Sequence, residues 1–417
     1  MAQPTEVLQH LLLDLLSTRR TVAPDLIARL NEGDWRRIME MAYHHRLHPM
    51  LHWRFKQVSQ RLELPKEIVE DLVTDFANAT WYGLLVQREL LRAHRILEAV
   101  AIPHIFLKGA FLAFFCYPNP ALKPLRDLDI LMPEAMAVQA LEILRDAGYL
   151  WSKRFRKSME DAMEMDKHLP PLWSPERKIY VEIHTRLFIP ERIATGCFTF
   201  PDEPALWRRR IHRNLTNTAV PFLCATDLLL HLIIHGAYDH HLNNGPFLFS
   251  NIAYLLEKET IDWPLFWQLV QDTGSSRGCL LTLEMVERYF GEQVIQWPSM
   301  AKDEYEITPE LMESAVLLTL QMNKYLSDWE RVHQKTIANK IREIRNRFFP
   351  SKRVIAARYP TTETSPFIYF WYFVKWCRML FVVAPTFLLS MRTQNAKNKI
   401  RHLVIYKRWL NRQISES

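Results

Sequence analysis

The stretch LKPLRDLDILM (residues 122–132) places Asp127 and Asp129 between large aliphatic residues. In a β-strand, successive side chains point to opposite faces, so the two aspartates share one face while Leu128 and Ile130 share the other. Two carboxylates on one face repel each other unless a cation lies between them, and an isolated buried charge is costly. The stretch therefore predicts a strand that holds a metal ion.

The patterns on both sides of this stretch predict a compact α/β module. IPHIFLKGA (residues 102–110) has the pattern of a short buried strand that leads through glycine into a helix. PEAMAVQALEILRDAGY (residues 133–149) predicts a helix with proline near its first turn and glycine at its end. KIYVEIHTRLF (residues 178–188) alternates again and predicts another strand.

Apolar residues recur at helical spacing before this module and after Thr226, so helical regions are expected to flank it. The sequence thus predicts an α+β protein with a small mixed-sheet core. The expected regions are 1–95 (N-terminal helices), 96–215 (α/β core), 216–350 (helical domain) and 351–417 (a basic, partly apolar helical tail).

Composition places the chain among soluble globular proteins, with 48% hydrophobic and 24% charged residues. The five cysteines are scattered and never spaced CxxC, which argues against a disulfide framework or a zinc ribbon and favours a reducing cytosol. The first 20 residues contain acids inside an apolar helical pattern and have no basic leader, so no secretory signal peptide is expected. The predicted location is the cytoplasm.

Charge is distributed unevenly. From residue 335 onward, 17 Lys and Arg face three Glu, a balance of +14, whereas the whole chain carries +7 and residues 1–334 therefore carry −7. Residues 366–391 are strongly apolar but contain Lys375, Arg378 and Pro385, which argues against a membrane span. We expect this stretch to pack on the helical region. Peripheral contact with the inner membrane is the alternative, and nucleic acid is a less favoured partner.

Three features of the α/β module are expected to meet at one site. Gly109 ends a strand and opens a helix, where free backbone N–H groups can receive a phosphate. Asp127, Asp129 and Glu182 supply oxygen ligands of the kind that Mg²⁺ prefers. If the strands pair, these acids can hold two Mg²⁺ ions beside the phosphates of an NTP.

This combination resembles the DNA polymerase β-type nucleotidyltransferase superfamily, with its glycine turn, D-x-D strand and third acid on a later strand. LKGAFLAFFCYPNPALKPLRDLDILM (residues 107–132), with ALEILRDAGY, HLPPL and VEIHTRL, is similar to an uncharacterised bacterial nucleotidyltransferase family. That family has the pattern LKG, R-x-x-D-x-D, G-Y and E-(L/I)-H. HHRLHPML and LHLIIHGA match further segments in order, so the resemblance covers most of the chain. It implies a polymerase β-like core with helical flanks.

The resemblance also implies roles for individual residues. Asp127 and Asp129 would bind metal, and Glu182 would be the third acid and would polarise the acceptor. The residues that would contact the nucleotide are Lys108, Gly109, Ala110 and Arg126. Two residues depart from the pattern: Ala110 stands where Ser or Gly is frequent, and Asn251 stands where relatives often have Asp. Arg126 also lies closer to the D-x-D motif than the arginine of the family does.

The histidines give weaker signals. His168 and His184 are interpreted as structural or substrate-lining. His231 and His235 have the i, i+4 spacing of a metal pair but lack the glutamate and third ligand of a zinc protease, so helix packing is the preferred interpretation for His235.

The function that these features favour is Mg²⁺-dependent transfer of NMP from an NTP to an unidentified acceptor, with release of pyrophosphate. One alternative is a catalytically weakened nucleotide-binding or scaffold protein of the same fold. The other is a phosphoryl transferase that uses the same metal site.

Overall fold

The computed structural model describes most of the chain. The described residues are 2–17, 19–20, 22, 24–58, 64–151, 163, 166–188, 203–291, 295–298, 305–320, 348–350, 352, 355, 359, 361–362, 364–383 and 394–411. Pro385 and one of the five cysteines, Cys197, lie outside these ranges.

The N-terminal region is helical, as its apolar spacing predicts. Its helices are α1 (Thr5–Leu16), α2 (Pro24–Ala28), α3 (Glu32–His44), α4 (His48–Val58) and α5 (Lys66–Ala99). A capping box begins α3, because the Asn31 side chain accepts a hydrogen bond from the Asp34 backbone N–H and the Asp34 carboxylate accepts one from Asn31. The chain that follows α3 turns sharply at Arg46, where φ is 59°.

A seven-stranded mixed sheet forms the centre of the protein, in the order β3-β4-β5-β2-β1-β7-β6. Its strands are β1 (Ile105–Phe106), β2 (Asp127–Leu131), β3 (Leu150–Trp151), β4 (Leu172–Trp173), β5 (Tyr180–His184), β6 (Ile211–Leu215) and β7 (Thr218–Phe222). β2 runs parallel to β5 and antiparallel to β1, and β1 runs parallel to β7. The sheet continues to Phe222, past the core boundary expected at residue 215, because β6 and β7 form one hairpin.

Short helices connect the strands. They are α6 (Gly109–Phe111), η1 (Leu112–Cys116), η2 (Pro120–Leu122), α7 (Glu134–Asp146) and α10 (Glu203–Arg209). α7 begins after Pro133 and is followed by Gly148, whose φ of 95° is a conformation that favours glycine. Both residues therefore lie where the sequence predicts.

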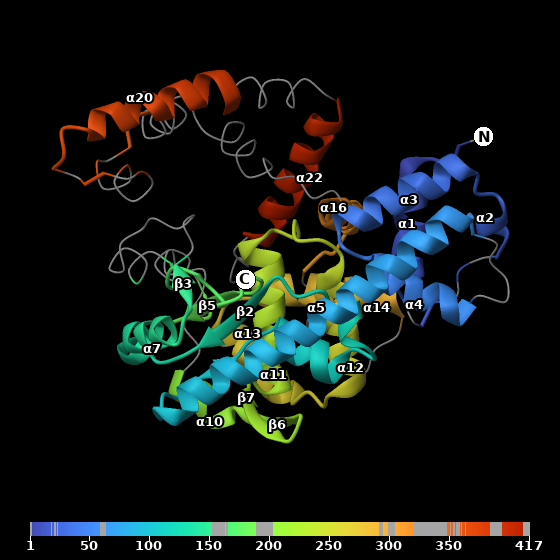
Figure 1. Ribbon diagram of the computed structural model, residues 1–417. Coiled ribbons are helices and arrows are strands. Elements are labelled where there is room, and N and C mark those ends of the chain that lie inside the picture. The colour runs from blue at the N-terminus through green and yellow to red at the C-terminus, as the bar shows by residue number, and fades with distance from the viewer. Residues whose placement is uncertain are drawn as a thin grey trace, which may run out of the picture.

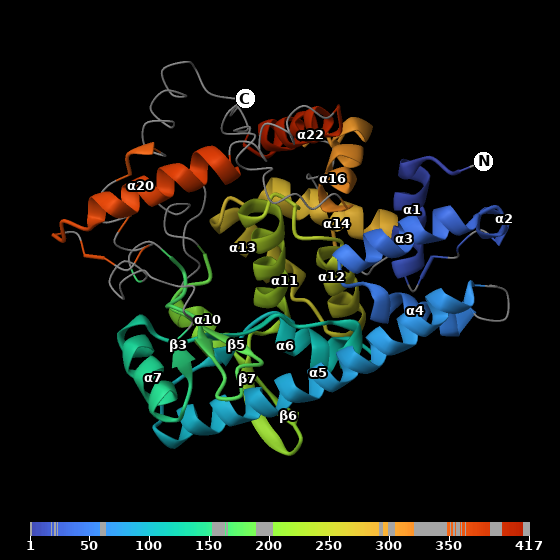
Figure 2. The ribbon, with the colours of Figure 1, turned by 45° about the horizontal axis from the view of Figure 1, so that its top comes forward.

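A second group of helices covers the sheet. It comprises α11 (Ala225–Ile233), η3 (Ile234–Asp239), α12 (Phe247–Lys258), α13 (Trp263–Asp272), α14 (Ser276–Phe290) and α16 (Pro309–Leu320). In Figure 2, α5 runs along the lower edge of the molecule and α11, α12 and α14 lie above it, with α6 between them. Every residue of α11 is buried, including the polar Thr226, Asp227 and His231 among its leucines and isoleucine. This mixed sheet with helical flanks confirms the predicted α+β class.

The C-terminal tail has two parts with different surroundings. α22 (Gln394–Leu410) packs against α16, and its Leu403 and Tyr406 are fully buried. α20 (Ile368–Arg378), continued by η4 (Met379–Val383), lies apart from the other labelled helices in Figure 1, and Ile368 is its one buried residue. The prediction that the apolar stretch packs on the helical region is therefore wrong for α20. No described helix has the length and apolarity needed to cross a membrane.

Candidate active site

A cavity of about 490 Å³ lies between the sheet and the helices that cover it. Its walls come from β2, β5, the β1–α6 turn, the α3–α4 connection, η3 and α12. The acidic, basic and histidine side chains that line it are His45, Arg46, Lys108, Lys123, Arg126, Asp127, Asp129, Lys167, His168, Glu182, His184, Asp239, His235 and His240. Gly109 also lines the cavity, whereas Ala110 is buried in α6 behind its wall.

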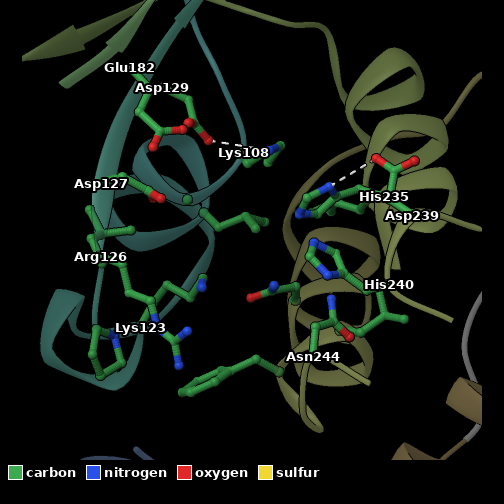
Figure 3. A pocket seen from close by; sticks show the side chains of 18 of the residues that line it. Lys108, Lys123, Arg126, Asp127, Asp129, Glu182, His235, Asp239, His240 and Asn244 are labelled. Atoms are coloured by element: carbon green, nitrogen blue, oxygen red, sulfur yellow. Dashed lines mark hydrogen bonds and ion pairs between the residues drawn. The ribbon is translucent and has the colours of Figure 1, made fainter. Parts of the chain in front are cut away.

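The acidic wall is set by the register of two parallel strands. Asp129 on β2 pairs with Glu182 on β5, and Leu131 pairs with His184. Figure 3 shows the carboxylates of Asp127, Asp129 and Glu182 on one side of the cavity. Ligand atoms of Asp129, Glu182 and His184 all lie within 4.8 Å of one another. Among the described residues, Asp127 stands outside that group of three, although it is on the same wall.

Asp129 is the most constrained of the three acids. Its Oδ2 lies 3.3 Å from Nζ of Lys108, and its Oδ1 accepts a hydrogen bond of 2.9 Å from Nε2 of His184. Burial would raise the pKa of Asp129, but the Lys108 ammonium and His184 hold it well below its usual range. Asp129 is therefore ionised at neutral pH, and His184 orients its carboxylate.

The pKa values of Asp127 and Glu182 are raised, in contrast to that of Asp129. Burial and the charges of Asp129 and Glu182 raise the pKa of Asp127 to about 7. Burial and the charge of Asp129 likewise raise the pKa of Glu182. Carboxylates whose charge is disfavoured in this way gain from a nearby cation. Three oxygen donors on a rigid sheet fit a hard divalent ion such as Mg²⁺.

The β1–α6 turn brings the backbone close to this wall. Lys108 has a φ of 39°, and its buried ammonium pairs with Asp129. Burial would lower the pKa of Lys108, but the carboxylates of Asp129 and Asp127 raise it. A Cβ at Gly109 would lie 2.5 Å from Cδ2 of Leu125, so any larger residue here would displace the end of the Leu125 side chain, in the segment that precedes β2.

Three basic side chains line the part of the cavity that lies away from Asp129 and Glu182. Lys123 and Arg126 precede β2, and Arg46, whose charge acts on Arg126, comes from the turn after α3. Within the described residues, none of the three forms an ion pair with a carboxylate. Burial lowers the pKa of Lys123 to about 8, and burial and the charge of Arg46 lower the pKa of Arg126. This part of the cavity is suited to an anion, and sequence reasoning identified only Arg126 of the three.

The wall that faces the acids is built by η3. Figure 3 shows His235, Asp239 and His240 on this side, across the cavity from Asp129 and Glu182. Nζ of Lys167 lies 3.2 Å from Oδ2 of Asp239 and 3.3 Å from Nδ1 of His235. The preferred interpretation of His235 as a helix-packing residue is therefore wrong, because its ring lines the cavity.

Sequence reasoning also missed Lys167 and Asp239. The His-Gly segment LHLIIHGAYD, which carries Asp239, was the one local signal that pointed to this wall. Asn251 lines the cavity from α12, and its Oδ1 accepts a hydrogen bond of 2.9 Å from the Tyr117 hydroxyl. This contact gives Asn251 a structural role in joining α12 to the end of η1.

Residues 31–291 match the sequence profile of a protein family described as uncharacterised nucleotidyltransferases. The match extends from the start of α3 to the end of α14, so it includes the whole sheet and all the walls of the cavity. A search of curated proteins finds no match to the chain.

Proposed function

The chain belongs to the uncharacterised nucleotidyltransferase family, and from this premise we propose that it transfers NMP from an NTP to an acceptor, with Mg²⁺ and with release of pyrophosphate. The observation that carries the proposal is the pairing of Asp129 with Glu182 on parallel strands at one end of a cavity. The other end of that cavity holds Arg46, Lys123 and Arg126, which form no ion pair with any carboxylate of the described residues. The cavity volume of about 490 Å³ falls within the range of about 300–1,000 Å³ found for small-molecule sites.

The acids would bind the metal ion, and one of them would take the proton from the acceptor. Asp127, Asp129 and Glu182 are the residues that would bind Mg²⁺. The ion would supply electrostatic stabilisation of the charge that develops on the phosphate oxygens. Glu182, whose pKa is raised by burial and by Asp129, suits a base that takes the proton from the acceptor nucleophile. A bond from that nucleophile to the α-phosphorus then forms as the bond from phosphorus to the pyrophosphate oxygen breaks.

The basic residues would hold the triphosphate. Arg46, Lys123 and Arg126 offer positive charge to the β- and γ-phosphates, and the Gly109 backbone lies at the turn between the acidic wall and this group. Holding the leaving pyrophosphate in this way offsets the charge that it gains in the transition state. The facing wall, with Lys167, His235 and Asp239, then remains for the acceptor.

A labelled-nucleotide assay tests this proposal. The full-length protein is incubated with Mg²⁺, each of the four NTPs labelled at the α- or γ-phosphate, and the small-molecule fraction of a cell extract. Transfer of α-label with release of pyrophosphate supports the proposal. Transfer of γ-label identifies a phosphoryl transferase instead. Binding of a non-hydrolysable NTP without any transfer identifies a catalytically weakened nucleotide-binding protein.

A further inference from the structure

Helix α20 carries a row of large apolar side chains in contact with solvent. Phe367, Tyr369, Phe370 and Phe373 are 73%, 63%, 55% and 60% exposed, although most buried aromatic residues of this protein lie in one continuous core. The exposed row continues into η4 with Leu380 and Phe381, at 53% and 77%. Exposed apolar surfaces of this kind mark contact with a partner or a membrane.

Three of these side chains occupy one side of the helix. With about 100° of rotation per residue, Tyr369, Phe370 and Phe373 fall within an arc of about 100°. The adjacent side is already occupied, because Trp376 donates a hydrogen bond of 2.6 Å to the Phe348 carbonyl oxygen and Tyr372 donates one to the Pro350 carbonyl oxygen. The segment around residues 348–352 therefore holds α20 by one side and leaves the aromatic side open.

Positive charge lies next to the aromatic side and on the side opposite to it. Nζ of Lys352 lies 5.2 Å from the ring centroid of Tyr369, whereas the helical spacing places Lys375 and Arg378, on the last turn of α20, on the side away from the aromatic residues. No acidic residue occurs between Glu363 and Glu416, a stretch that contains nine Lys and Arg. An aromatic helix face with basic residues on the other side, on a helix whose described residues are too few to span a membrane, is the composition of a segment that lies in a membrane interface.

We propose that α20 binds the surface of an anionic lipid bilayer. The aromatic side would lie at the level of the headgroups and acyl boundary, while the basic residues meet the lipid phosphates. A second copy of this chain fits less well, because the same basic residues would be brought together in a symmetric contact. The surface lies on a part of the chain beyond the matched residues 31–291, so the proposal is independent of the nucleotidyltransferase reaction.

Co-sedimentation of the full-length protein with vesicles tests the proposal. We expect binding to vesicles with phosphatidylserine or phosphatidylglycerol, weaker binding to pure phosphatidylcholine, and a loss of binding as salt rises. Since each basic residue near an anionic surface contributes about 1 kcal/mol, or about fivefold in partitioning, the double variant K352Q/R378Q is expected to bind about 30-fold more weakly.

The double variant F370S/F373S removes the aromatic contact and should lose binding to anionic vesicles. V73S/L84S is a matched control, because both residues are exposed apolar side chains of α5, at 48% and 59%, and its binding should be unchanged. Binding that persists in F370S/F373S, or no binding by the unmodified protein, overturns the proposal. Dimerisation without vesicles that F370S/F373S abolishes overturns it in favour of an interface between copies.

Discussion

Asp129 and Glu182 pair with each other across the parallel strands β2 and β5, so two acids that are 53 positions apart in the sequence share one face of the sheet. Two further contacts, from Lys108 and His184, hold Asp129 ionised at this face. Asp129 is thus fixed by its partners, whereas Glu182 keeps a raised pKa and freedom to exchange a proton.

Glu182→Gln is expected to reduce NMP transfer by at least about 100-fold, because it removes both a metal ligand and the base, while the fold is retained. Asp129→Asn is a less clean test, since leaving Lys108 buried without its partner can cost about 3–5 kcal/mol of stability. Turnover and thermal unfolding should be measured together. Glu176→Gln, at a surface acid that pairs with Arg88, is the control. Unchanged turnover in Glu182→Gln would contradict the assigned site.

Asp127 should make the stability of the metal-free protein depend on pH. Its pKa is about 7 in the folded protein against 3.8 as the reference value, so the folded state binds the proton more tightly. Stability is then lost as the pH rises from about 4 to about 7. Asp127→Asn should remove this dependence and stabilise the metal-free protein at pH 8 by about 1 kcal/mol. This figure is discounted because the Asp127 side chain, although the cavity wall removes part of its hydration, is still exposed to solvent. Chemical unfolding at pH 5 and pH 8 provides the measurement.

The same carboxyl group should make Mg²⁺ binding depend on pH. Below about pH 7 the ion must displace a proton from Asp127, so the affinity should fall by up to about tenfold for each pH unit. In Asp127→Asn the affinity should be low and should change less with pH, because Glu182 is then the remaining proposed ligand whose pKa is raised. Isothermal titration with Mg²⁺ alone, from pH 5.5 to pH 8.5, distinguishes the two. If the logarithm of the Mg²⁺ affinity changes equally with pH in both proteins, a group other than Asp127 releases the proton when Mg²⁺ binds.

Gly109→Ala should weaken NTP binding through Leu125. The added Cβ would lie 2.5 Å from a terminal methyl group of Leu125, which must move, and overpacking of this kind costs about 1–3 kcal/mol. Leu125→Ala added to Gly109→Ala should relieve the clash and recover part of the affinity for a non-hydrolysable NTP. Failure of the second change to restore any binding would point to a direct need for the Gly109 backbone conformation.

Arg46→Gln should weaken binding of an NTP more than binding of the corresponding NMP. A hydrogen bond between charged groups contributes about 1.5–3 kcal/mol, which corresponds to a loss of about 10- to 150-fold for the NTP. Arg95→Gln is the control, because Arg95 lies on the exposed surface of α5, away from the cavity, and donates a hydrogen bond to the Leu91 carbonyl oxygen of its own helix. Equal losses for NTP and NMP in Arg46→Gln would place Arg46 away from the β- and γ-phosphates.

The sequence by itself determined the local framework of the site. Side chains in a strand alternate between two faces with a period of two residues, so the sequence pattern places Asp127 and Asp129 on one strand face. A second alternating run identifies the strand that carries Glu182. Proline and glycine likewise mark the ends of α7. These features depend on neighbours in the sequence and need no knowledge of distant contacts.

Only the tertiary structure decided which distant residues complete the cavity. Arg46, Lys167 and Asp239 come from three separate segments, and no periodicity links them to β2. The pairing of His184 with Asp129 depends on the strand register, and the role of His235 depends on the wall that η3 presents. The C-terminal tail is a second case in which sequence was insufficient. Helices α20 and α22 both contain basic and apolar residues, but α22 packs against α16 whereas α20 has one buried residue. Whether a helix face is buried depends on the surface that packs against it in the tertiary structure, and the sequence of the helix alone does not determine that surface.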